Sequence, residues 1–235
     1  ALWFRLELAN AEGTRRTLDS MDFAIPTPVP QPFPPTAPKL PPPPLDLRFR
    51  CKRDSFPGLE VVVRPTLAAD RLSWSLAVNR VPSGWSLVSV TSPVLEVGAL
   101  GGDPGDDRLL LPNGFGRAYP TLNGARYRGN YPSGSCCMQW MGVTDGTSGL
   151  YLGAHDATAS TKFLDTQGVT GEPRTPLSIN IPAPNATVPG NNFTVPGEFV
   201  LAVVDGGYFP ACRLYRRWLD RNAPWWPEPG KFSRS

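Results

Sequence analysis

The single histidine of the chain, His155, stands next to Asp156, and such a pair is the first candidate for catalysis. Nucleophilic catalysis needs a histidine that a third group orients against a serine or cysteine. Residues 149–156 are typical of a strand, in which neighbouring side chains point to opposite faces. Asp156 is therefore not expected to orient His155. We interpret His155 as a strand-end residue satisfied by a neighbouring backbone carbonyl, and one histidine cannot build a histidine-rich metal centre.

Paired carboxylates are the second source of chemistry, because a glycosidase places two of them about 5 to 10 Å apart across the bond it cleaves. The candidates are Asp145, Asp156, Asp165 and Glu172. They form no recognisable motif, and a chain with 20 acidic residues always contains some pair. The residues alone therefore predict no catalytic residue and no cofactor.

The loop at residues 101–107, GGDPGDD, holds three aspartates. Calcium takes oxygen ligands from turns of this kind, but the spacing does not match an EF-hand. We interpret the loop as a solvated acidic turn, so no metal site is predicted.

Aromatic side chains are a further possibility, since sugar rings stack on flat faces through their C–H groups. Trp74 and Trp140 share their expected strand faces with apolar residues, which predicts that both lie in the core. Three tyrosines fall in a stretch rich in Arg, Gly and Asn that is expected to be an ordered surface loop. These candidate carbohydrate-binding residues are Tyr119, Tyr127 and Tyr131. The alternative is that they only pack the loop.

The four cysteines, Cys51, Cys136, Cys137 and Cys212, are even in number and match no zinc spacing. This favours disulfides, for which three connectivities exist. A bridge between the neighbours Cys136 and Cys137 is the most strained. We therefore expect Cys51 and Cys212 each to pair with one of these two, while the alternative is that some cysteines are buried thiols.

Two N-glycosylation sequons, at Asn185 and Asn192, lie in a loop rich in Pro, Gly and Asn, where a glycan would be accessible. Sequons and an even number of cysteines together predict a secreted or extracellular protein. The chain starts at Ala1, which is expected of a processed form or of a part of a longer protein.

Composition argues against two classes of partner. The 23 basic and 20 acidic residues are spread along the chain without a basic block, so no nucleic-acid partner is expected. No window approaches the roughly 18 uninterrupted apolar residues that a membrane span needs.

Short strands must position these groups. Apolar and polar residues alternate at residues 2–8 and 72–78, and residues 138–143 and 149–156 are typical of a hairpin closed by a polar turn. Regular short strands between Gly, Pro and Asn turns favour an antiparallel β-sandwich. Near the end, apolar residues at helical spacing predict one α-helix, which Pro224 ends.

Residues 25–44 hold 11 of the 29 prolines. Proline has a fixed φ and no backbone donor, so this segment cannot be a central strand or a helix and should be a stiff polyproline II insert. It is either a spacer over the domain surface or a decorated, partner-binding segment. In the second case Pro41, Pro42, Pro43 and Pro44 would be hydroxylated and carry glycans.

The predicted fold class is therefore all-β, an antiparallel β-sandwich with a proline-rich polyproline II insert and one C-terminal α-helix. Its predicted parts are a first hairpin at 1–24, the insert at 25–44, the main sandwich at 45–210, the helix at 211–222, and a linker or tail at 223–235.

Several segments occur in an order that resembles a known arrangement. They are LLLPNGFGRAYP at 109–120, residues 131–163, and YRRWLDRNAPWW at 215–226. The strongest piece is Met-Gln-x-Met, then Gly-Leu-Tyr-Leu-Gly-x-His-Asp, then Thr-Lys. Together they resemble the N-terminal, galactose-mutarotase-like β-sandwich region of an uncharacterised glycoside-hydrolase-like family, in which a catalytic (β/α)₈ barrel follows. The resemblance implies that the acid and base carboxylates lie on that barrel, whereas the proline-rich insert and the Cys136–Cys137 pair depart from the pattern.

Three hypotheses follow for function. The first is a secreted, glycosylated, non-catalytic β-sandwich that associates with carbohydrate and supports a following catalytic domain. The second is a structural glycoprotein of an extracellular matrix, surface appendage or fibril, whose sandwich packs against copies of itself. The third is a fragment of an active glycoside hydrolase.

Overall fold

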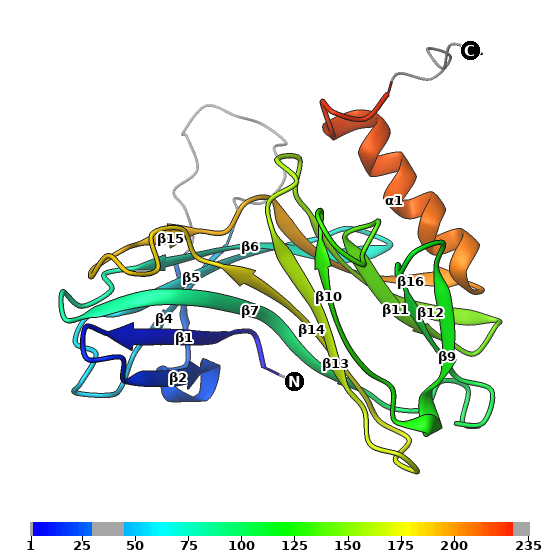
Figure 1. Cartoon of the computed structure of the whole chain (residues 1–235), viewed down its shortest axis with the longest axis horizontal. Coiled ribbons are helices and arrows are strands. Elements are labelled where there is room, and N and C mark those ends of the chain that lie inside the picture. The colour runs from blue at the N-terminus through cyan, green and yellow to red at the C-terminus, as the bar shows by residue number, and fades with distance from the viewer. Residues whose placement is uncertain (1, 30–44, 228–235) are drawn as a thin grey trace. The chain divides into compact units, whose positions relative to one another are not determined.

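The computed structural model describes residues 2–29 and 45–227, which form antiparallel β-strands and one α-helix near the C-terminus (Figure 1). The predicted all-β antiparallel class with one C-terminal α-helix is thereby confirmed. The chain divides into two compact units, the first made of Ala1–Val94 and Asn180–Glu198 and the second of Leu95–Ile179 and Phe199–Ser235. No helix among the described residues is long and apolar enough to cross a membrane.

The first unit is built from two groups of strands. Its strands are β1 (Arg5–Asn10), β2 (Arg15–Asp19), β3 (Thr27–Val29), β4 (Asp46–Arg50), β5 (Glu60–Leu67), β6 (Arg71–Asn79), the larger part of β7 (Trp85–Val97) and β15 (Phe193–Thr194), with a 3₁₀ turn at Ser20–Asp22. One group has the order β7-β1-β2, and the other has the order β3-β4-β5-β6, with β15 also paired to β6.

The alternation at the start of the chain places the core of this unit. Phe4, Leu6 and Leu8 are completely buried, as expected for one face of a strand. The ring of Phe4 meets Phe23 at 5.1 Å and Phe49 of β4 at 5.2 Å between centroids, both edge to face. The two groups of strands therefore pack face to face through aromatic residues, as in a sandwich.

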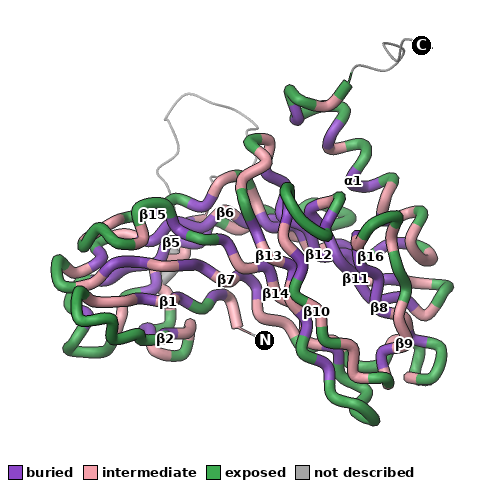
Figure 2. The backbone as a smooth tube through the Cα atoms, viewed as in Figure 1, coloured by how far each residue is buried: buried purple, intermediate pink, exposed green. Residues whose placement is uncertain are grey.

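The second unit again contains two groups of strands. Its elements are β8 (Arg108–Leu111), β9 (Arg117–Pro120), a 3₁₀ turn (Thr121–Asn123), β10 (Arg126–Tyr131), β11 (Trp140–Thr144), β12 (Ser148–His155), β13 (Lys162–Gln167), most of β14 (Thr175–Pro182), most of β16 (Glu198–Asp205) and α1 (Tyr208–Asn222). The strand orders are β10-β13-β14 and β16-β12-β11-β8-β9. Buried residues are concentrated in the second group, as the purple segments of β11 and β12 show (Figure 2).

The predicted hairpin is present as β11 and β12, whose register pairs Trp140 with Gly153 and Gly142 with Tyr151. Each large ring thus lies opposite a glycine, and the two rings stack at 5.3 Å between centroids. A Cβ at Gly153 would come within 2.6 Å of the Tyr151 hydroxyl. The glycines are therefore needed for the rings to share one face of the hairpin.

Helix α1 packs its apolar stripe on this face. Ala211, Leu214, Tyr215 and Leu219 are buried against a cluster that includes Trp140 and Val200. The predicted helical spacing is confirmed, but the helix begins at Tyr208, three residues before the predicted start. The earlier start places Pro210 in the first turn of the helix. Proline is tolerated there because backbone donors in the first turn have no intrahelical acceptor.

The predicted insert at residues 25–44 is described only at its start. There Thr27–Val29 forms β3, which pairs antiparallel with β4 and stands first in its strand order, so the polyproline II prediction is wrong for these three residues. An outer position is where a proline-containing strand is tolerated. Residues 30–44, including Pro41 to Pro44, lie outside the described residues.

Candidate functional site

His155 ends strand β12 and Asp156 follows it, and both are buried, with 6% and 1% of their surface exposed. The His155 Nε2 atom lies 2.8 Å from the Tyr151 hydroxyl. The imidazole also stacks on Trp218 of α1, with 4.7 Å between ring centroids. His155 therefore connects the sheet to the helix through its side chain, and the backbone carbonyl that the sequence suggested as its partner stays a prediction.

Asp156 turns away from this aromatic group into a polar network of its own. Its carboxylate accepts hydrogen bonds from the backbone N–H groups of Thr158 and Ser160, each at 2.8 Å. It also pairs with Lys162 Nζ at 3.1 Å. Burial opposes the charge, but the Ser160 and Thr158 hydrogen bonds and the Lys162 ammonium outweigh it and lower the pKa of Asp156 to about 2. The carboxyl is thus fully ionised at neutral pH.

Tyr131 belongs to the same network rather than to a surface loop. It ends strand β10, is 6% exposed, and receives the Lys162 ammonium over its ring at 5.0 Å. Gln139 Nε2 donates to the Asp156 carbonyl at 3.1 Å and to the Tyr131 hydroxyl at 3.4 Å. The expected loop is therefore wrong at this position, and the Tyr131 side chain is a core residue.

Tyr119 and Tyr127 lie on β9 and β10, again on strands instead of a loop, and both are half-buried. The Tyr119 hydroxyl accepts from Arg117 Nη1 at 3.2 Å. The Tyr127 hydroxyl lies 3.0 Å from Ser135 Oγ and 3.2 Å from Cys136 Sγ, and burial together with Cys136 raises the pKa of Tyr127 to about 12. These two tyrosines, with Arg117, are the part of the predicted carbohydrate site that a ligand can reach.

The other carboxylates are held in ways that do not suit acid catalysis. Asp145 closes the β11–β12 turn, where hydrogen bonds from Ser148 and Thr147 lower its pKa to about 2. Asp165 pairs with Arg128 at 2.8 Å, and Glu172 is exposed. A general acid at neutral pH needs a raised pKa, so the lowered pKa values of Asp145 and Asp156 argue against that role.

The acidic loop at residues 101–107 is solvated only in part. Asp103 and Asp106 are exposed, as expected, whereas Asp107 is buried and its Oδ2 accepts from the Leu100 N–H at 3.1 Å. Burial, with the nearby charges of Asp106 and Asp145, raises the pKa of Asp107. Among the described residues, no group of three or more His, Cys, Asp or Glu side chains is placed to hold a metal ion.

The four cysteines are free thiols in this structure, so the disulfides remain a prediction. Cys136 is buried and Cys137 is exposed. Desolvation raises the pKa of all four thiols. Both sequon asparagines, Asn185 and Asn192, are exposed, which is the geometry that glycan attachment requires.

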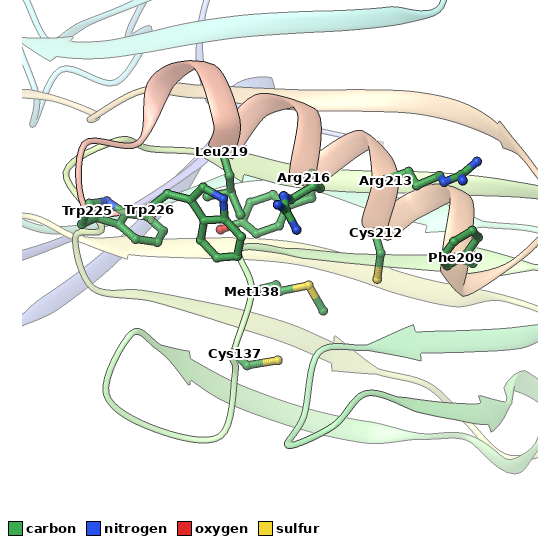
Figure 3. A pocket seen from close by; sticks show the side chains of 10 residues that line it. Cys137, Met138, Phe209, Cys212, Arg213, Arg216, Leu219, Trp225 and Trp226 are labelled. Carbon is green, nitrogen blue, oxygen red and sulfur yellow. The ribbon is translucent and has the colours of Figure 1, made fainter. Parts of the chain in front are cut away.

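The sequence did not predict a cavity of about 460 Å³ beside α1 (Figure 3). It is lined by Cys137, Met138, Phe209, Cys212, Arg213, Tyr215, Arg216, Leu219, Trp225 and Trp226. The segment after α1 closes one end. Trp225 Nε1 donates to the Ala157 carbonyl at 2.9 Å, and Trp226 Nε1 donates to Asp220 Oδ1 at 2.9 Å. In the sequence, only the two adjacent tryptophans could have indicated that the segment after α1 packs against the rest of the domain.

No family model matches the chain. A protein of Monosiga brevicollis named "Putative glycoside hydrolase 22789" is 36% identical over 129 residues, which are 52% of this chain and 10% of that protein. The chain therefore spans about a tenth of the curated relative that it matches.

Solved structures show the same fold. The α-N-acetylgalactosaminidase NagBb of Bifidobacterium bifidum in complex with GalNAc is similar with a TM-score of 0.60 and 14% identity, over 91% of this chain and 33% of that one. A quadruple mutant of the same enzyme gives a TM-score of 0.63 at 12% identity, again over 91% and 33%. The predicted resemblance to the β-sandwich region of glycoside-hydrolase-like proteins is thus confirmed. This chain has the fold of one third of a glycosidase and sequence similarity to part of a protein named as a glycoside hydrolase.

Proposed function

We propose that this chain is a non-catalytic β-sandwich domain of a glycoside-hydrolase-like protein, that it is secreted and glycosylated, and that it associates with carbohydrate. The observation that carries the proposal is the match of nearly the whole chain to a third of a glycosidase structure. This match supports an assignment of the chain to one part of a larger glycoside-hydrolase-like protein.

The state of the carboxylates supports a non-catalytic role. Asp156 is enclosed by Thr158, Ser160 and Lys162, and Asp145 is used to close a turn. A glycosidase instead needs one carboxyl that keeps its proton near neutral pH beside a second that is ionised. The pKa of each of these two groups is lowered to about 2, which leaves both ionised.

Carbohydrate association is supported by Tyr119 and Tyr127. Both rings are partly exposed, and Arg117 next to them supplies donors for sugar hydroxyl groups. Secretion and glycosylation are supported by the exposed asparagines of the two sequons, Asn185 and Asn192.

A glycan array tests the binding. We expect the wild-type protein to bind a subset of glycans and the Tyr119→Ala and Tyr127→Ala variants to lose at least ten-fold in affinity, about 1.4 kcal/mol for a stacked ring and its hydrogen bond. Phe115→Ala is the matched control, because Phe115 is a fully exposed aromatic residue near the start of β9. Equal loss in all three variants, or no binding by the wild type, would contradict carbohydrate association.

A second candidate, a piece of an active hydrolase, is favoured by the name of the Monosiga relative and by the tenth of its length that this chain spans. Assays of nitrophenyl glycosides distinguish the two candidates. We expect no hydrolysis by this chain alone and hydrolysis by a longer protein that contains it. Cleavage by this chain that is lost in Asp156→Asn or Asp165→Asn would overturn the non-catalytic role.

A further inference from the structure

We propose that the cavity beside α1 binds a small organic anion with an apolar body, such as an aromatic carboxylate. This inference goes beyond the proposed function and does not depend on it. The volume of about 460 Å³ lies within the roughly 300–1,000 Å³ that is usual for small-molecule sites.

The walls of the cavity suit an apolar body. Met138, Leu219 and Trp226 face it, and the remaining lining atoms come mostly from rings, thiols and aliphatic chains (Figure 3). A neutral sugar would find few acceptors for its hydroxyl protons here, and unpaired polar groups are costly when they lose water. An aromatic or aliphatic body loses no hydrogen bonds on entering.

Arg216 is the anchor for the anionic group, and its neighbours hold it in position. Its Nε donates to Asp220 Oδ1 at 2.9 Å, and its guanidinium stacks on Trp226 at 5.0 Å from the ring centroid. Trp226 Nε1 donates to the same Asp220 oxygen, so the three side chains form one unit. Figure 3 shows the Arg216 guanidinium below the helix beside Trp226, on the side of Met138.

The two terminal amino groups of Arg216 make no hydrogen bond within the described part of the chain. A carboxylate can accept from both, which is the bidentate geometry that arginine favours. The binding group is therefore present and already oriented, which reduces the entropy lost when a ligand binds.

The charge of the lining also favours an anion. The lining contains two arginines and no acidic side chain. Arg213, the second arginine, stacks over Phe209 at 4.6 Å, and no carboxylate in residues 2–29 and 45–227 pairs with it. Burial raises the pKa of Cys137, Cys212 and Tyr215, so these lining groups stay neutral at pH 7 and do not repel an anion.

Isothermal titration calorimetry with 2-naphthoate and its neutral analogue 2-naphthamide tests the site. We expect the wild-type protein to bind 2-naphthoate about ten-fold more tightly than 2-naphthamide, because a pair of charge-assisted hydrogen bonds usually contributes about that much to affinity. Arg216→Gln should remove this preference and leave the 2-naphthamide affinity unchanged. Arg217→Gln is the matched control, because Arg217 is the next residue of the same helix, is exposed, and does not line the cavity.

A second measurement locates the ligand without relying on a variant. Saturating 2-naphthoate should slow the alkylation of Cys212, which lines the cavity, and leave the alkylation of Cys51 unchanged. Equal affinity for the two naphthalenes, or the same effect of Arg216→Gln and Arg217→Gln, would overturn the proposal. The proposal would also be overturned if the protein did not bind 2-naphthoate but self-associated, and if Phe209→Ser abolished that self-association. That result would assign the mouth of the cavity to a second copy of the chain.

Discussion

Lys162 and Asp156 form an ion pair from which water is excluded, with 3.1 Å between Nζ and Oδ2 and with 0% and 1% of the two side chains exposed. The pair spans the loop between the end of β12 and the start of β13. The Ser160 carbonyl accepts a second hydrogen bond from the ammonium at 2.6 Å, and the Tyr131 ring covers it. The network therefore joins β10, β12 and β13 through one buried charge pair.

Breaking this pair should be costly. In Lys162→Met the Asp156 carboxylate would stay buried without its partner, so we expect the free energy of unfolding to fall by about 3–5 kcal/mol. Urea unfolding followed by fluorescence measures the loss. Arg128→Met is the control, because the Arg128–Asp165 pair bridges β10 and β13 with its arginine 53% exposed and should contribute less than about 1 kcal/mol. Similar losses in the two variants would show that the network does not keep water out.

The same carboxyl predicts how stability depends on pH. The pKa of Asp156 falls from 3.8 to about 2 on folding, since hydrogen bonds from Ser160 and Thr158 and the Lys162 charge outweigh its burial. A carboxyl with a lowered folded pKa stabilises the protein fully above its unfolded pKa and loses that contribution as the pH falls through the folded value. We therefore expect a loss of about 2 kcal/mol between pH 4 and pH 2.

Urea titrations at a series of pH values measure this loss, and Asp156→Asn should reduce the slope between pH 4 and pH 2. The slope should not vanish, because the pKa of Asp145 is also lowered to about 2 and contributes over the same range. Asp54→Asn, at an exposed position, is the control. An unchanged slope in Asp156→Asn would mean that the native state does not hold this carboxylate ionised.

Much of the fold follows from local patterns in the sequence. Strand β1 has Leu6 and Leu8 completely buried at alternate positions, because the side chains of a strand alternate between its faces. Helix α1 has Leu214 and Leu219 buried at helical spacing. The helix begins at Tyr208, before the predicted start at residue 211, and its first turn includes Pro210, a position where proline is tolerated.

The candidate site was less predictable because tertiary contacts create it. Lysine is almost never fully buried unless it is paired, so its residue type predicts an exposed Lys162. The partner that makes burial possible, Asp156, is seen only in the folded structure. Tyr131 is enclosed by Lys162 and Gln139, which lie on other segments, and this could not be deduced from its own neighbours. The tail holds no periodic pattern, yet Trp225 bonds to Ala157, 68 residues away in sequence.

The hydrogen bond between Tyr151 and His155, both on β12, gives a third prediction. The Tyr151 hydroxyl and His155 Nε2 are bonded at 2.8 Å in the core. Tyr151→Phe removes the hydroxyl, and we expect a loss of about 1–3 kcal/mol of unfolding free energy, since a buried bond is lost without replacement by water. Thermal and urea unfolding measure it.

Tyr127→Phe serves as the comparison for that bond, because the Tyr127 hydroxyl lies in a half-buried position where water can replace Ser135 and Cys136. It should cost less than Tyr151→Phe. Glycan binding should be unchanged in Tyr151→Phe, because Tyr151 is fully buried. Loss of glycan binding at unchanged stability would assign Tyr151 and His155 a direct role toward the ligand.

The two sequons give the last prediction. Asn185 and Asn192 are exposed, and so are Thr187 and Thr194, which complete the two sequons. Expression through a eukaryotic secretory pathway should add one N-linked glycan at each asparagine, visible as a mass shift that peptide N-glycosidase removes. Thr187→Ala should remove one glycan and Thr194→Ala the other, whereas Thr187→Ser should retain its glycan because serine preserves the sequon. The asparagine Oδ1 at 192 accepts from the Val81 N–H at 3.2 Å, so replacing the threonines avoids disturbing that bond. A mature protein of unmodified mass would refute glycosylation and with it the main support for secretion.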